Sequence, residues 1–119
     1  MARKVIDNPN HCSLVHAMNI IGGKWKPIII YLLANGSLRF GKLLIFIPNI
    51  SKKVLTEQLR ELEGDGLIIR ERFAETPPRV EYSLSKKGEA LLPILKQLSE
   101  WTVSNFEDVE FETCRIITI

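Results

Sequence analysis

The chain has 119 residues, of which 45% are apolar and 25% are charged, and its formal net charge is +2 at pH 7. These values fit one globular domain and exclude a wholly disordered chain, but a core of this size leaves much surface that a second copy could cover. Because the sequence shows no signal peptide, no run long enough to span a membrane and no metal-ligand spacing around its two cysteines, we expect a cytoplasmic protein without metal or cofactor.

The small net charge conceals an uneven distribution. Residues 24–60 carry seven bases against one acid, Glu57, whereas residues 100–119 carry five acids against one base, Arg115. This asymmetry suits a domain that holds a polyanion with one face. Solvated surface charge alone also produces such clusters, so the asymmetry does not decide the function.

Two helices are predicted in the first third of the chain. Residues 1–11 read as a polar arm, and apolar residues at helical spacing then predict a helix over residues 11–21. A second helix begins near Lys24 with Pro27 in its first turn, where the missing N–H does no harm. This helix is apolar on nearly all sides and ends at residues 35–36.

Residues 40–62 have the layout of a helix-turn-helix. A short helix over residues 40–46 is followed by a tight turn, and Ser51 is suited to cap a longer helix that ends near residue 63. The second helix of such a unit lies in the major groove of DNA. There, lysine, arginine and threonine side chains can contact phosphates and the edges of the nucleobases. The expected contact residues are Ser51, Lys52, Lys53, Thr56 and Arg60. An amphipathic surface helix without DNA contacts would show the same periodicity.

The period then changes from helix to strand. Residues 67–73 and 79–84 predict two strands joined by a loop with two prolines, too long for a two-residue turn. A hairpin directly after a helix-turn-helix is typical of a winged helix. We expect Arg79, at the base of the loop, to reach a phosphate or the minor groove, the alternative being an ion pair with Glu75 or Glu81.

The last helix, capped by Ser85, has more apolar surface than a small monomer can bury. We expect it to form a homodimer together with the first helix. The predicted interface residues are Leu14, Met18, Leu91, Leu95, Leu98 and Trp101. Residues 111–119 form a tail beyond the last helix. Its two candidate roles are an added strand and a dimer contact. Trp25 is expected to be a core anchor, and Tyr82 is expected to pack under the wing.

Several stretches resemble the HxlR-type family of bacterial winged-helix regulators, which are similar to the MarR group. They are IGGKW at 21–25, RF at 39–40, ISKKVLTEQLRELEGDGL at 50–67 and PPRVEYSLSKKG at 77–88. The resemblance covers about residues 12–105 and implies a mostly helical α+β domain over residues 12–110, a winged helix-turn-helix with a two-stranded wing and a long C-terminal dimerisation helix. It also implies a homodimer that binds operator DNA in a sequence-specific manner and regulates transcription, with Arg39 among the DNA contacts.

The chain departs from the family pattern in and after the third helix. Leu44 and Ile45 stand where polar residues are expected, Lys42 where an acid is usual, and Asn49 where glycine is usual. The third helix is therefore more apolar and more basic than the resemblance implies.

Cys12 matches an N-terminal cysteine that resembles a sensor of oxidants or electrophiles in some members of the family. Sensing needs a thiolate, which His11 or Lys24 would favour if either is close in space. The alternative is that Cys12 is a small buried apolar residue near the dimer core. The effector, whether an oxidant, an electrophile or another small molecule, stays open.

Two other classes of function remain for comparison. A winged helix can serve as a protein-interaction module, but its binding face would be more apolar than the basic face expected here. The sequence offers no nucleophile–base pair, no paired carboxylates in a motif and no phosphate-binding loop, so we do not expect an enzyme.

Overall fold

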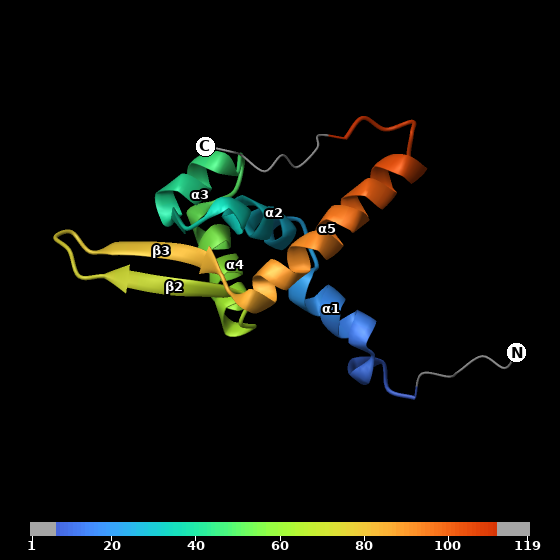
Figure 1. Ribbon diagram of the computed structural model, residues 1–119, viewed down its shortest axis with the longest axis horizontal. Helices are drawn as coiled ribbons and strands as arrows, with labels where there is room; N and C mark the ends of the chain where they lie inside the picture. Colours follow the sequence, from blue (N-terminus) through green and yellow to red (C-terminus); the bar gives the residue numbers. More distant parts are fainter. Residues whose placement is uncertain (1–6, 112–119) are drawn as a thin grey trace, which may run out of the picture.

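The computed structural model describes residues 7–111, which form five α-helices and one three-stranded antiparallel sheet (Figure 1). The elements in chain order are a 3-10 turn (Pro9–His11), α1 (Ser13–Ile21), α2 (Trp25–Leu32), a second 3-10 turn (Leu33–Asn35), β1 (Leu38–Arg39), α3 (Phe40–Phe46), α4 (Lys52–Gly64), β2 (Ile68–Phe73), β3 (Arg79–Leu84) and α5 (Lys86–Asn105). The predicted winged helix-turn-helix architecture is confirmed.

Local sequence signals place most helix ends. The Ser51 hydroxyl oxygen accepts a hydrogen bond of 3.1 Å from the backbone N–H of Val54, and Ser85 accepts one of 3.1 Å from Gly88. Each bond satisfies an amide that a helix start otherwise leaves unpaired, and both predicted caps are confirmed. The first helix starts two residues later than predicted, at Ser13, because the residues before it form a separate 3-10 turn.

The sheet contains a third strand that the sequence analysis missed. Leu38–Arg39, expected only to lead into the third helix, pairs antiparallel with β3, and the strand order is β1-β3-β2. Leu38 lies opposite Tyr82, and Arg39 lies opposite Glu81. Because the strand has two residues, it shows no alternation in the sequence. It attaches the base of the wing to the start of α3.

The wing is the β2–β3 hairpin, paired from Ile68–Leu84 to Phe73–Arg79 and closed by a five-residue loop over 74–78. Side chains alternate between the faces of a strand, and directly opposed residues share a face. One face carries Ile68, Arg70, Arg72, Val80 and Tyr82, and the other carries Ile69, Glu71, Phe73, Arg79 and Glu81. The first face is turned toward the core and α4, since Ile68 is buried at its inner end.

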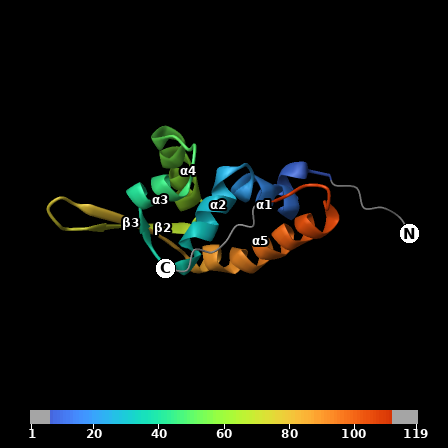
Figure 2. The ribbon, with the colours of Figure 1, turned by 90° about the horizontal axis from the view of Figure 1, so that it is seen from above.

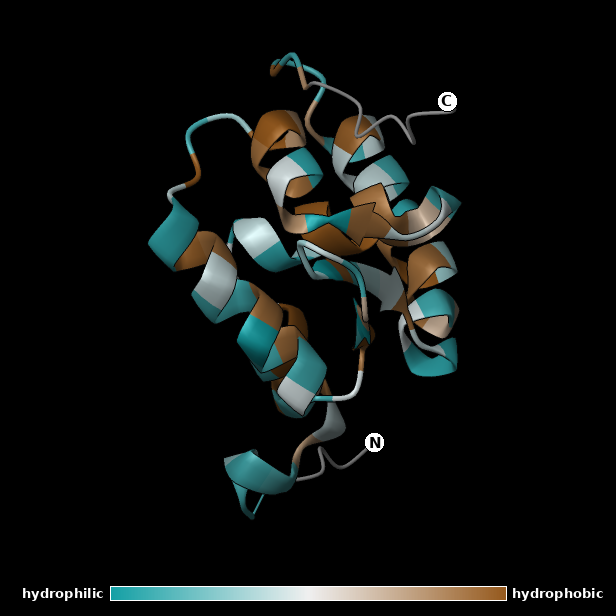
Figure 3. Cartoon of the chain, turned by 90° about the vertical axis from the view of Figure 1, so that its left-hand side faces the viewer, coloured by the Kyte–Doolittle hydropathy of each residue, from teal (hydrophilic) through white to brown (hydrophobic). Residues whose placement is uncertain are grey.

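The apolar core lies between the helices and the inner end of the sheet (Figure 3). Its most deeply buried side chains are Ile29, Ile30, Leu43, Ile47, Leu55, Leu59 and Leu62. Trp25 is partly buried against this core, as predicted, and Tyr82 on β3 is partly buried against it as well. At Gly88, α5 crosses the turn before β2 so closely that an added methyl group would overlap the carbonyl oxygen of Leu67.

The two ends of the molecule are different in character. The wing extends from one side of the body, while α1 and α5 extend from the opposite side (Figure 1). A view from above shows α3 and α4 on one side of α2, with α5 on the other (Figure 2). The exposed surface of α4 and the outer surfaces of α1 and α5 therefore lie on different sides of the molecule.

Candidate nucleic-acid interface

The polar face of α4 is exposed as predicted. Its exposed residues include Lys52, Lys53, Thr56 and Arg60, with Ser51 exposed at the cap. The opposite face consists of Leu55, Leu59 and Leu62, each at most 2% exposed. These three leucines fix the rotation of α4 about its own axis, so its basic side chains project away from the body.

The hydroxyl of Thr56 is partly used within the helix. Its Oγ1 donates a hydrogen bond of 2.7 Å to the backbone carbonyl of Lys52. The hydroxyl hydrogen of Thr56 is thereby occupied, whereas its methyl group and a lone pair of Oγ1 remain available for contacts with DNA. A thymine methyl or the amino group of adenine or cytosine matches these remaining groups.

The turn between α3 and α4 explains one departure from the family pattern. Asn49 has φ of 70°, in the left-handed region that glycine adopts most easily and that asparagine tolerates better than most other residues. On α3, Leu44 is half-buried. Ile45 is 70% exposed, and Lys42, three residues earlier on the same helix, is exposed as well. A single exposed isoleucine does not make α3 an apolar binding face.

Lys26 contributes to the basic charge of residues 24–60 but not to the basic surface. It is 7% exposed on α2, and its Nζ lies 2.8 Å from Oε2 of Glu61 on α4. This ion pair connects α2 to the C-terminal half of the candidate recognition helix. One of the seven basic residues counted in residues 24–60 is therefore buried, and it holds α4 in place through Glu61 instead of adding to the surface charge.

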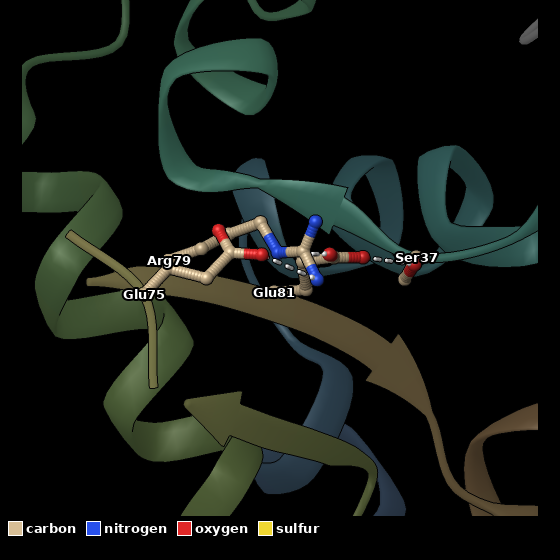
Figure 4. Close-up of polar contacts among 4 residues, drawn as sticks. All are labelled: Ser37, Glu75, Arg79 and Glu81. Atoms are coloured by element: carbon tan, nitrogen blue, oxygen red, sulfur yellow. Dashed lines mark hydrogen bonds and ion pairs between the residues drawn. The ribbon is translucent and has the colours of Figure 1, made fainter. Parts of the chain in front are cut away.

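Arg79 is held by neighbours on the outer face of the wing (Figure 4). Its Nε lies 3.0 Å from Oε2 of Glu81, and its Nη2 lies 3.5 Å from Oε1 of Glu75. The guanidinium also covers the ring of Phe73 at 4.1 Å, and Glu81 accepts a 2.7 Å hydrogen bond from the hydroxyl of Ser37. Arg79 therefore forms the ion pairs with Glu75 and Glu81 that were the alternative to a DNA contact. These pairs lie on the sheet face turned away from α4.

Arg70 and Arg72 were missed by the sequence analysis. Both are exposed on the face of β2 that is turned toward α4, and neither is in an ion pair with any residue in the range 7–111. Strand alternation places both on one face of β2, but only the burial of Ile68 shows that this face is the one turned toward α4. Arg39 is exposed as well, at the N-cap of α3 and opposite Glu81 in the sheet.

Cys12 lies between the first 3-10 turn and α1, with a free, half-buried thiol. Lys24 is engaged elsewhere, since its Nζ lies 4.7 Å from the centre of the Trp25 ring. The tail predicted over residues 111–119, with the second cysteine, Cys114, lies outside the described residues except for Phe111. Within residues 7–111, no group of His, Cys, Asp and Glu side chains is arranged to hold a metal, and no helix has the length and apolarity to cross a bilayer.

The predicted dimer residues fall into two groups. Leu14, Met18, Leu98 and Trp101 are 47–67% exposed on α1 and α5. Leu91 is partly buried against the core, and Leu95 is 4% exposed within it. Leu95 therefore has little surface left for a partner, because its side chain already packs inside its own protomer.

A helix-turn-helix followed directly by an antiparallel hairpin defines the class of winged helix-turn-helix proteins. The sequence model of the HxlR-like helix-turn-helix family matches residues 20–110, and the chain belongs to this family. The resemblance noted in the sequence is thereby confirmed.

The relatives are regulators by name. The chain is 50% identical over 95 residues to an HTH-type transcriptional regulator of Methanothermobacter thermautotrophicus, covering 80% of this chain and 72% of the relative. Its structure is similar to the redox regulator HypR in its reduced form, with a TM-score of 0.77 and 42% identity over 82% of this chain and 96% of HypR. It is also similar to the reduced form of the transcriptional regulator YodB from Bacillus subtilis, with a TM-score of 0.75 and 34% identity over 83% and 98% of the two chains.

Proposed function

We propose that this chain regulates transcription in the cytoplasm as a homodimer that binds a specific operator in duplex DNA. The exposed basic face of α4 carries the proposal. Lys52, Lys53 and Arg60 project from a helix whose start is capped by Ser51 and whose back is fixed in the core. Lysine and arginine suit phosphate and guanine contacts, and the free amides of a helix start also favour a phosphate.

The exposed apolar side chains support the homodimer. Among the described residues, all the large apolar side chains that are exposed, apart from Ile45 and Ile69, lie on α1, on α5 or in the segment after α5. Apolar clefts of 220 and 370 Å³ lie between these helices, the larger one reaching α2. Contiguous apolar surface of this kind marks an interface, and a second copy offers matching side chains such as Leu98 and Trp101.

A two-fold dimer would set the geometry of the operator. Its two α4 helices would enter successive major grooves on one side of the DNA. The half-sites would then be centred about 34 Å apart, or a multiple of that, in an imperfect palindrome.

The protein-interaction module is the weaker candidate. A protein-binding face is usually depleted of charge at its centre, whereas the exposed residues of α4 include three basic and three acidic side chains, with Lys52 and Lys53 and no acid in the first turn. Ile45 is the one large apolar side chain exposed on α3. The positive charge at the start of α4 therefore favours DNA.

A response to oxidants or electrophiles through Cys12 is the second part of the proposal. HypR is described as a redox regulator, and this chain has a free thiol directly before α1. Because α1 carries part of the proposed dimer surface, modification of Cys12 would act on the arrangement of the two α4 helices.

Selection from a random duplex library followed by fluorescence anisotropy tests the DNA-binding proposal. The Lys53→Ala, Arg60→Ala double variant should lose most operator affinity, while a Lys86→Ala, Lys96→Ala double variant on α5 serves as a charge-matched control. Operator affinity unchanged in the folded double variant would contradict the proposed reading face. For the dimer, Leu98→Glu should give a folded monomer in sedimentation, and a wild-type protein that is monomeric at micromolar concentration would contradict it.

A further inference from the structure

A polar cleft of 340 Å³ lies between α4 and the wing, beside the proposed reading face. It is lined by Thr56, Leu59, Arg60, Glu63, Arg70 and Tyr82. Four of these residues come from α4, one from β2 and one from β3. The cleft therefore joins the two elements that a winged helix brings to DNA.

Two cations dominate the charge of the cleft. Arg60 and Arg70 are both exposed, and neither forms an ion pair with a described residue. Glu63 is the one carboxylate in the lining, and it too lies beyond ion-pair distance from any described cation. Two guanidinium groups on facing elements against one carboxylate favour an anion with several oxygens, which the arginine fork matches in shape.

Tyr82 adds an available donor. Its ring is partly buried, in register with Arg70 on β2 and Leu38 on β1. Among the residues that the structure describes, its hydroxyl has no hydrogen-bond partner. The hydroxyl of Thr56, by contrast, already donates to its own helix.

We propose that Arg60 and Arg70 together bind one phosphate of the DNA backbone in this cleft. The inference rests on the proposed function, because it places the backbone that borders the major groove between α4 and the wing. A backbone phosphate fits better than a free anion, since the cleft adjoins the exposed face of α4. Arg72, two residues farther along the same face of β2, continues the positive charge toward the tip of the wing.

This assignment divides the arginines of the wing by sheet face. Arg70 contacts the phosphate on the face turned toward α4. Arg79, on the other face, pairs with Glu75 and Glu81 within the wing itself. Arg60 then fixes the position of α4 on the duplex rather than reading a base.

The salt dependence of DNA affinity tests the proposal, measured on a nonspecific duplex because a phosphate contact does not depend on sequence. Arg70→Ala should weaken binding about tenfold at low salt, the effect of one charge-assisted hydrogen bond. It should also remove about one unit of salt slope, so that raising salt from ~50 to ~200 mM costs roughly 3.5-fold less affinity than in wild type. Arg70→Lys should keep the salt slope but lose part of the affinity, because lysine retains the charge and not the guanidinium fork. Glu63→Gln should strengthen binding, and Lys96→Ala should match wild type.

A double-variant cycle tests whether the two arginines share one phosphate. The Arg60→Ala, Arg70→Ala protein should lose less affinity than the sum of the single losses. Strictly additive losses would mean two separate phosphates and would overturn the shared site, as would an Arg70→Ala protein that binds like wild type at every salt concentration. Inorganic phosphate that binds wild type but not Arg70→Ala, with DNA affinity unchanged, would assign the cleft to a free anion. A wild-type protein that binds no duplex would instead refute the proposed function itself.

Discussion

The ion pair between Lys26 and Glu61 should respond unequally to loss of either partner. The side chain of Lys26 is 9% exposed, whereas that of Glu61 is 56% exposed. Removal of Lys26 leaves a carboxylate that water can solvate. Removal of Glu61 leaves a buried ammonium group without its counter-ion, and an uncompensated buried charge is the costly outcome.

The expected magnitudes follow from this difference in burial. A fully buried pair that loses one partner costs about 3–5 kcal/mol, and an unsatisfied buried group costs about 1–3 kcal/mol. Because water reaches the Glu61 side of the pair, we expect Glu61→Ala to lower the free energy of unfolding by about 2 kcal/mol. Lys26→Met keeps the volume and the helix propensity, and should stay within about 1 kcal/mol of wild type.

Urea unfolding of the two single variants and the double variant measures these values. The double variant should resemble Lys26→Met, because without the ammonium the loss of Glu61 matters little. Operator affinity measured on the same proteins reports whether the pair also orients α4. Equal destabilisation by Lys26→Met and Glu61→Ala would refute the reasoning, since it would mean that the pair itself and not the buried charge determines stability.

Three further predictions concern the rest of the chain. Gly88→Ala should lower the free energy of unfolding by about 1–3 kcal/mol, because the added methyl group overlaps a backbone carbonyl. Gly64→Ala, whose methyl group enters open space, should raise the free energy of unfolding by up to about 1 kcal/mol. Urea unfolding measures both values. Arg79→Ala should lower DNA affinity through a displaced wing while leaving the salt slope unchanged, and a slope reduced by about one would restore Arg79 as a phosphate contact. In a Cys114→Ser background, the oxidant diamide plus an added small thiol should change operator affinity, and the same treatment of Cys12→Ser should have no effect if Cys12 is the sensor.

Signals that act over a few residues were read correctly from the sequence. Ser51 and Ser85 cap α4 and α5 because a cap depends on the hydroxyl and an amide three residues later. The hairpin was found because each strand has six residues, long enough to show its pattern. β1 escaped because a two-residue strand exists only through its pairing with β3.

The choice between the arginines of the wing needed information that the sequence does not show. Arg79 stands beside two prolines at the loop, which made it the obvious candidate. Only the register and the burial of Ile68 show that Arg79 and Arg70 lie on opposite faces. Likewise Lys26 counts as surface charge until packing places it inside the protein.

The apolar surface of α5 shows why the dimer residues were only partly separable from the core. A helix turns through one cycle every 3.6 residues, so residues four and seven apart form a stripe. Ile94, Leu98 and Trp101 form one such stripe, and each is 49–57% exposed. Leu95, one position farther along the chain than Ile94, falls on a neighbouring stripe and is 4% exposed. One stripe suffices for the protomer's own core, and the second is surplus in a monomer. The sequence shows the total apolar surface, but only the packing against α2 and β3 determines which stripe is left for a partner.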